Sequence, residues 1–233
     1  MPQQLTLDLP LRPAMGRDDF FVSSANAGAV AQIDAWRDWP MAKLVLCGPA
    51  ASGKTHLAHV WATAAQAQIV AATTVADTLE TLTEASALVV EDADTIGGDA
   101  AAEEALFHLH NALAHRSAPL LLTARKAPAR WGINLPDLAS RLAQAGLATL
   151  AAPDDALLMA VMMKRAFDRK LPLSPNILSY AAPRLERSFA AADAFIARVD
   201  ALALSEKRKP SMAHARRALE EAHLADPSAD GSS

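Results

Sequence analysis

One eight-residue segment has the composition and spacing of a phosphate-binding loop. Residues 48–55, Gly-Pro-Ala-Ala-Ser-Gly-Lys-Thr, match the pattern G-x-x-x-x-G-K-[ST]. Glycines allow a tight turn that aims backbone N–H groups at phosphates, the lysine reaches β and γ oxygens, and the threonine can ligate magnesium. The pattern predicts ATP or ADP with Mg²⁺ as ligands, rather than a chance glycine turn. The nucleotide-binding residues predicted from this segment are Gly48, Pro49, Ala50, Ala51, Ser52, Gly53, Lys54, Thr55 and His56.

An acidic pair follows a second apolar segment. Glu91 and Asp92 come directly after residues 87–90, which are Ala-Leu-Val-Val. A carboxylate at the end of a neighbouring strand commonly helps to hold the magnesium of a phosphate-loop site. We therefore expect Glu91 and Asp92 to take part in catalysis and Glu91, with Thr55, to bind the metal. The alternative is a strand that ends in a solvated acidic loop.

Alternating apolar and helical segments predict the elements that position these residues. The segment before the loop, residues 43–47, is a short apolar run that follows a helical pattern over 26–39. Similar runs separated by helical stretches indicate a parallel α/β sheet. These further strand candidates are residues 68–72, 87–90, 119–123 and 146–150.

The chain changes character after Pro153, where strand-like runs stop and helical patterns continue. We expect an extended N-terminal arm over 1–19, an α/β nucleotide-binding domain over 20–152, a helical domain over 153–222 and a tail of disordered composition over 223–233. The predicted helices of the second domain are residues 154–170, 175–182, 188–205 and 211–222.

Composition narrows the class of protein. The chain has 233 residues and a formal net charge of −4, so it lacks the basic excess expected of a protein that holds a nucleic-acid backbone. Cys47 is the only cysteine, which excludes an internal disulfide framework and fits a reducing compartment. The sequence carries no membrane-spanning run and no signal-peptide pattern. We expect a cytoplasmic protein without a membrane partner.

The motifs together resemble one protein family. The chain is similar to the nucleotide-binding part of the DnaA family of bacterial replication initiators, which are AAA+ ATPases, and most of all to short family members that regulate the initiator. The resemblance runs over residues 20–219, and it implies an AAA+ phosphate-loop fold with a parallel sheet and a small helical lid. It also implies that the helix-turn-helix domain of the initiator is absent. The segments that carry the resemblance are 48–57, 106–113, 120–125, 135–142 and 185–188.

The resemblance assigns roles to three further residues. Arg141 corresponds to an arginine finger that projects from one subunit toward the nucleotide of its neighbour, a task that suits a permanently charged, bidentate guanidinium. Arg187 corresponds to the lid arginine that contacts phosphates in the same subunit. Asn26 corresponds to the adenine pocket. From the residues alone, Arg141 could equally form a surface salt bridge and Arg187 could be a solvated arginine.

Two departures from the family pattern bear on hydrolysis. Glu91 stands where an aspartate is usual at the magnesium position, and Arg125 stands where the initiator has an aspartate after its fourth strand. Because magnesium tolerates little deviation from octahedral geometry, we expect weak or no intrinsic ATPase activity while nucleotide binding persists.

The N-terminal arm contains a candidate docking peptide. Residues 4–9, Gln-Leu-Thr-Leu-Asp-Leu, resemble the peptide by which several bacterial proteins bind the β sliding clamp of DNA polymerase III. The predicted clamp-binding residues are Gln4, Leu5, Leu7 and Leu9, whose leucines suit apolar pockets. An ordinary edge strand is the alternative for the hexapeptide alone.

The resemblance implies a negative regulator of DNA replication that promotes hydrolysis of the ATP bound to DnaA, together with DNA-loaded clamp, and so prevents over-initiation. Its partners would be DnaA and the clamp, with DNA contacted only through the clamp, and a homo-oligomer is possible. The alternatives are an initiator-like or helicase-loader AAA+ ATPase that contacts DNA, and a phosphate-loop kinase of small molecules.

Overall fold

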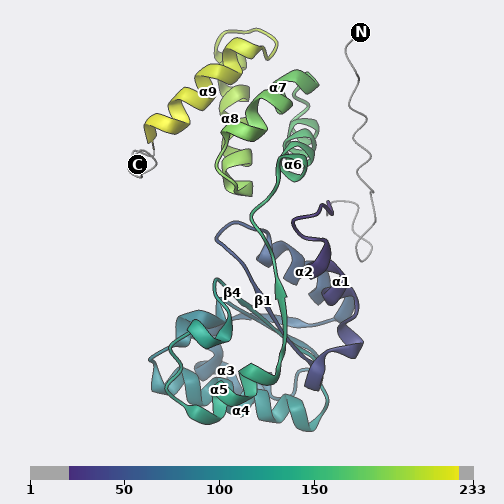
Figure 1. The fold of residues 1–233 in the computed structure, drawn as a ribbon, viewed down its shortest axis with the longest axis vertical. Coiled ribbons are helices and arrows are strands. Elements are labelled where there is room, and N and C mark those ends of the chain that lie inside the picture. The colour runs from purple at the N-terminus through teal and green to yellow at the C-terminus, as the bar shows by residue number, and fades with distance from the viewer. Residues whose placement is uncertain (1–20, 226–233) are drawn as a thin grey trace. The chain divides into compact units, whose positions relative to one another are not determined.

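The protein divides into two compact units in the computed structural model, which describes residues 21–225 (Figure 1). The first unit ends at Ala151 and the second begins at Ala152. The candidate clamp peptide at residues 4–9 lies outside the described residues.

A five-stranded parallel sheet forms the centre of the first unit, in the order β2-β3-β4-β1-β5. β1 therefore lies between β4 and β5, with Val45 opposite both Leu122 and Leu147. The expected α/β fold with a parallel sheet is confirmed. The strands are β1 (Lys43–Cys47), β2 (Gln68–Ala71), β3 (Leu88–Glu91), β4 (Leu120–Ala124) and β5 (Gly146–Thr149).

Helices cover both faces of this sheet (Figure 1). α1 (Ala27–Asp34) and α2 (Lys54–Ala65) bury Ile33, Leu57 and Trp61 against strand residues such as Leu44 and Leu121. The helices α3 (Val75–Leu82), α4 (Ala100–His115) and α5 (Pro136–Gln144) cover the opposite face. Successive side chains of a strand point to opposite faces of the sheet. Val45 therefore packs in the hydrophobic cluster under α3, α4 and α5, while Leu44 and Leu46 pack in the cluster under α1 and α2.

Several boundaries differ from the sequence prediction. The helix expected over 26–39 ends at Asp34 and is followed by a 3₁₀ helix, Trp36–Asp38. The reason is packing, because Trp39 stacks on Trp61 with ring centroids 5.1 Å apart, and its indole N–H donates to the Gln32 carbonyl at 2.7 Å. The latter bond satisfies a carbonyl near the helix end that would otherwise lack a partner. The other 3₁₀ helices are Pro40–Ala42, Ala72–Thr74, Ala93–Ile96, Pro128–Arg130 and Ala182–Arg184.

The second unit is helical and has its own core. α6 (Asp155–Asp168) and α8 (Phe189–Ser205) are capped by Asp154 and Ser188, whose side chains accept the N–H groups of Leu157 and Ala191. The remaining helices are α7 (Pro175–Ala181) and α9 (Met212–Ala225). The predicted tail over 223–233 is therefore wrong for residues 223–225, because the helix-forming sequence of α9 continues through Ala225. None of the helices in residues 21–225 combines the length and apolar character needed to cross a bilayer.

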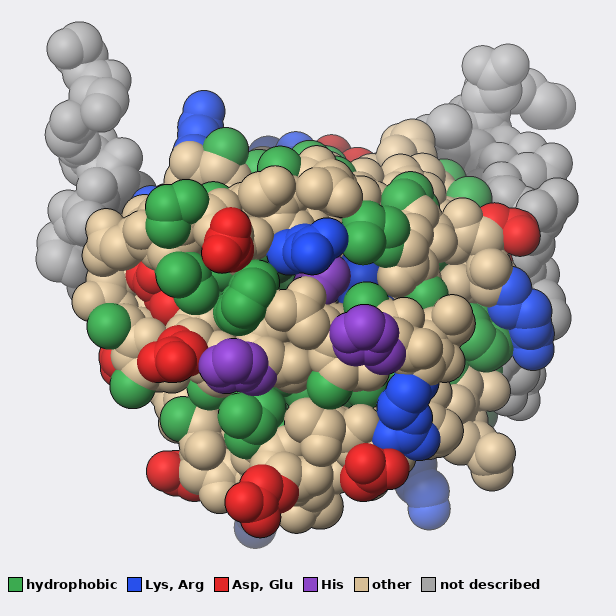
Figure 2. Space-filling view, turned by 90° about the horizontal axis from the view of Figure 1, so that it is seen from below, with side chains coloured by type: hydrophobic (Ala, Val, Ile, Leu, Met, Phe, Trp, Pro, Cys, Tyr) green, Lys and Arg blue, Asp and Glu red, His purple; other side chains and the backbone are tan. Residues whose placement is uncertain are grey.

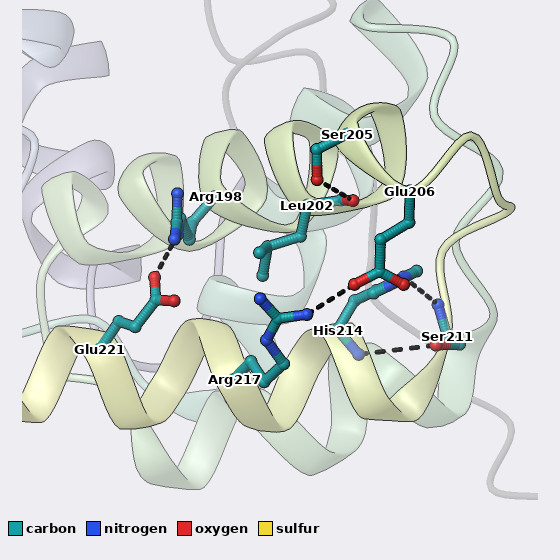
Figure 3. Close-up of polar contacts among 8 residues, drawn as sticks. All are labelled: Arg198, Leu202, Ser205, Glu206, Ser211, His214, Arg217 and Glu221. Carbon is teal, nitrogen blue, oxygen red and sulfur yellow. Dashed lines mark hydrogen bonds and ion pairs between the residues drawn. The ribbon is translucent and has the colours of Figure 1, made fainter.

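A polar network joins α8 to α9 (Figure 3). The buried His214 ring contacts Glu206 at 3.0 Å through Nε2 and accepts the Ser211 N–H at 3.2 Å through Nδ1. Because Nδ1 accepts, the neutral ring carries its proton on Nε2. Ser211 and His214 thus form a capping box in which histidine replaces the usual glutamate or glutamine. Arg217 also contacts Glu206, and Arg198 pairs with Glu221.

Candidate nucleotide-binding site

The phosphate-binding loop leaves the carboxyl end of β1 and leads into α2. The Gly48 N–H donates to the Ala124 carbonyl at 3.2 Å, which fixes the start of the loop against β4. A side chain at Gly48 would place its Cβ 2.5 Å from the Leu150 carbonyl oxygen, so only glycine fits there. Gly53 has φ +94° and precedes the first residue of α2. That left-handed conformation favours glycine and aims the end of the loop at the helix N-terminus.

Lys54 lies over the loop backbone. Its Nζ donates to the carbonyls of Gly48 and Pro49 at 2.9 and 2.7 Å, and the residue is only 8% exposed. Burial lowers the pKa of Lys54, while the carboxylates of Asp92 and Asp94 oppose that effect. The amino group is therefore held by the loop beside the end of the acidic strand.

The remaining residues of the phosphate-binding loop have small side chains, so the loop offers mainly backbone groups to a ligand. Pro49, Ala50 and Ala51 are exposed, whereas Ser52 is buried and its hydroxyl has no hydrogen-bond partner among residues 21–225. Thr55 and His56 are exposed in the first turn of α2. A loop of this form, followed by a helix of 12 residues, offers N–H groups and the positive end of the helix dipole to an anion.

The predicted acidic residues come to the same edge of the sheet. The Asp92 N–H donates to the Thr123 hydroxyl at 3.1 Å, and Asp94 accepts the Arg125 N–H at 3.0 Å. Glu91 is half-buried, and one of its carboxylate oxygens is buried without a hydrogen-bond partner in the part of the chain that the structure describes. The same holds for one oxygen of Asp94.

These donors fit a magnesium ion of the kind that phosphate-loop sites hold. Among residues 21–225, no three histidines, cysteines or carboxylates converge as a metal cage. Magnesium usually needs only one or two carboxylates, with water and phosphate oxygens completing its coordination. The Thr55 hydroxyl and the unpartnered Glu91 oxygen are the donors that would hold it. When bound, magnesium would supply positive charge at the β and γ phosphates.

Arg141 lies on α5, far along the sequence from the phosphate-binding loop at residues 48–55. The residue is half-buried and forms no ion pair with any side chain that the structure describes. Its charge lowers the pKa of His110, an effect smaller than those of burial and of Lys43. A guanidinium without a carboxylate partner remains available to an external anion, which is what an arginine finger requires.

Sequence reasoning missed Glu103, which anchors the segment that leads into α5. Glu103 is 1% exposed, and its carboxylate accepts the N–H groups of Gly98, Asn134 and Leu135 at 2.8–3.1 Å. Burial raises its pKa, but the three N–H donors outweigh that effect and the net pKa is lowered. The only sequence signal was its position near the start of α4, four residues after Asp99.

Asn26 and Arg187 have local partners. The Asn26 side chain accepts the Ser23 N–H at 2.8 Å and donates to the Phe21 carbonyl at 2.9 Å, so it braces the turn before α1. Arg187, in the second unit, pairs with Asp155. Arg187 and Asp155 line a pocket of about 580 Å³ at the N-terminus of α6, and Asn26 is not part of its lining. Their predicted contacts with a nucleotide stay predictions.

The sheet order, the loop and the helical second unit define an AAA+ phosphate-loop fold. No protein-family model matches the chain. Among solved structures, it is similar to domain III of the Thermotoga maritima replication initiation protein DnaA, with a TM-score of 0.79, 17% identity, and coverage of 91% of this chain and 98% of that one.

Two further structures share the fold. A replication initiator DnaA bound to AMPPCP and single-stranded DNA gives a TM-score of 0.69 at 16% identity, with coverage of 84% of this chain and 69% of that chain. The Thermotoga maritima RuvB Holliday junction branch migration motor gives 0.62 at 18% identity, with coverage of 76% and 61%. At these identities the similarity establishes the fold.

Proposed function

We propose that this protein binds ATP or ADP at residues 48–55 and acts as a regulator of DnaA, as does the short DnaA relative Hda. The observation that carries the nucleotide-binding part is the loop itself, with Lys54 held over its backbone at the N-terminus of α2. The similarity to domain III of DnaA, over nearly all of that domain, supports the part of the proposal that relates this chain to replication initiators.

In this proposal Arg141 acts on the nucleotide of the partner. The protein docks on DNA-loaded clamp through Gln4, Leu5, Leu7 and Leu9, engages ATP-bound DnaA in the bacterial cytoplasm, and presents Arg141 to the γ-phosphate of that ATP. Arg141 has no ion pair with any residue between 21 and 225, and its helix is anchored by the bond from Leu135 to Glu103; both observations support this role. The hydrolysed nucleotide belongs to DnaA, and the nucleotide of this chain fixes its own conformation.

The decisive experiment follows radiolabelled ATP on DnaA in the presence of DNA-loaded clamp. Wild-type protein should accelerate conversion to ADP, and Arg141→Ala should lower that acceleration by roughly 10³- to 10⁵-fold, as for other arginine fingers. Arg141→Lys should be nearly as inactive because lysine lacks the planar fork. Arg130→Ala removes an exposed arginine of the same unit and serves as the control. Wild-type stimulation by Arg141→Ala would exclude Arg141 from the mechanism.

A second experiment tests the docking peptide. Deletion of residues 1–10 should abolish binding to the clamp in surface plasmon resonance. Nucleotide binding should be retained because the phosphate-binding loop at residues 48–55 lies outside the deleted segment. Changing Gln4 and Leu5 together to alanine should have the same effect. If the truncated protein binds the clamp as tightly as the full chain, the peptide assignment is wrong.

An initiator-like or helicase-loader ATPase that contacts DNA is the main alternative. The face of the first unit shown in Figure 2 mixes acidic, basic, histidine and hydrophobic side chains, with no field of basic groups across it. A face of that composition does not favour binding of the phosphate backbone of DNA. Direct DNA binding with a steep salt dependence would favour this alternative, and ATP turnover stimulated by a small molecule would favour a kinase.

A further inference from the structure

Arg125 places a second cation beside the phosphate-binding loop. β4 lies between β1, which leads into the loop, and β3, which ends at the acidic pair. Arg125 is the first residue after β4, and the residue before it accepts the Gly48 N–H at 3.2 Å. The parallel strands therefore place Arg125 between the loop and the carboxylates. In keeping with this position, the positive charge of Arg125 contributes to lowering the pKa of Lys54, after the larger effect of burial.

The guanidinium of Arg125 has no acidic partner within the described part of the chain. The residue is exposed, and only its backbone N–H contacts Asp94. Several arginines of the second unit differ in this respect, because Arg165, Arg187 and Arg198 each pair with a carboxylate. Arg125 thus keeps its full donor capacity for a ligand.

The negative charges near the phosphate-binding loop indicate which ligand the Arg125 guanidinium would bind. Glu91, Asp92 and Asp94 bring three carboxylates to the edge where the phosphates of a nucleotide would lie. Their repulsion of the phosphates is usually offset by magnesium. An arginine stays protonated at every ordinary pH and grips phosphate oxygens through two parallel N–H groups. It can offset the same repulsion from within the protein.

We infer that Arg125 binds the terminal phosphate of the nucleotide held by this chain and supplies the charge that magnesium usually supplies, so that nucleotide binding does not require a divalent cation. The inference rests on the proposed nucleotide binding and adds to it a metal-independent mode. It concerns the chain's own nucleotide and is separate from the role of Arg141.

Calorimetric titration of the full-length protein with ATP, in excess magnesium and in excess EDTA, tests this inference. The wild-type Kd should change by less than about threefold between the two conditions. Arg125→Ala should bind with near wild-type affinity in magnesium but at least about tenfold more weakly in EDTA, the effect expected for loss of a charged hydrogen bond. Arg125→Lys should fall between them because it keeps the charge and loses the fork.

Lys126→Ala is the matched control, since it removes the same charge from the next exposed position of the same loop. It should behave as wild type in both conditions. A wild-type affinity that collapses in EDTA, or an Arg125→Ala protein no more sensitive to EDTA than Lys126→Ala, would overturn the inference while leaving nucleotide binding in place. Failure of wild-type protein to bind any adenine nucleotide in either condition would instead overturn the proposed function.

Discussion

At the scale of single residues, Lys54 is the side chain on which nucleotide binding should depend most. Lys54→Ala removes the only cation of the loop at residues 48–55, which in the proposed function would reach the β and γ phosphates, and we expect no measurable ATP or ADP affinity by calorimetry. The unchanged circular dichroism spectrum of the variant would show that the fold is retained. Undiminished affinity would exclude residues 48–55 as the binding loop.

His110 should make stability depend on pH. Burial, with the charges of Lys43 and Arg141, lowers its pKa from 6.5 to about 4, so the folded protein holds the ring neutral. Between these pH values the unfolded chain binds more protons, and stability therefore rises with pH. We expect about 3 kcal/mol of unfolding free energy to be lost as the pH falls from 6.5 to 4.

Urea denaturation of the wild type and of His110→Leu over this pH range measures the effect. The leucine variant lacks the titrating group, so its unfolding free energy should be nearly level from pH 6.5 to about 5. Equal slopes for the two proteins would assign the acid sensitivity to other groups.

At the scale of elements, Glu103 links the start of α4 to the segment before α5. Glu103→Gln turns an amide NH₂ toward backbone N–H donors, and Glu103→Ala leaves Gly98, Asn134 and Leu135 without their acceptor. We expect the alanine variant to be destabilised by about 3 kcal/mol or more, because each buried donor left unpaired costs about 1–3 kcal/mol. Glu104→Ala, an exposed neighbour, should cost far less.

The same bonds connect Glu103 to the proposed function. Because the segment before α5 positions Arg141, Glu103→Gln should reduce stimulation of DnaA-bound ATP hydrolysis more than it reduces nucleotide binding by this chain. Since its folded pKa is lowered, the contribution of Glu103 to stability is complete above the ordinary pKa of 4.5 and is lost as the pH falls through the lowered value. Equal loss of both activities would indicate general unfolding.

The sequence predicted those features that depend on local pattern. All five strands were expected within one residue at either end because buried parallel strands are continuous apolar runs bounded by helical segments. The phosphate-binding loop was predictable from its spacing. Glu103 was not, because two of its three partners, Asn134 and Leu135, lie 31 and 32 residues away and nothing in a surface-like helix sequence marks a buried carboxylate. The early end of α1 depends likewise on tertiary packing of tryptophans.

At the scale of the whole molecule, we expect two residues at the sheet edge, Glu91 and Arg125, to limit ATP turnover by the isolated protein. Glu91 would place a longer side chain than aspartate at the predicted magnesium position, and Arg125 follows β4. We expect partner-free turnover well below about 1 per second, the lower end for ordinary phosphoryl-transfer enzymes. A robust turnover in a phosphate-release assay would contradict the regulatory proposal.

The two residues can be replaced together. Glu91→Asp with Arg125→Asp gives both positions the residues that the resemblance to the initiator predicts there, and we expect this double variant to hydrolyse ATP faster than wild type. The same variant in a Lys54→Ala background should be inactive, which controls for contaminating ATPases. An inactive double variant would mean that other residues suppress hydrolysis.

The strand order also has a consequence for synthesis on the ribosome. β1 is the first strand made, yet its partners are residues 120–124 and 146–149. Until both have left the exit tunnel, β1 lacks its ladder hydrogen bonds, and Gly48 lacks the Ala124 carbonyl that fixes the loop. Sheets built from such distant pairings form late and expose apolar strands meanwhile. A nascent chain stalled before residue 120 should therefore be sensitive to protease and unable to retain nucleotide, whereas one extended well beyond residue 150 should acquire both properties together.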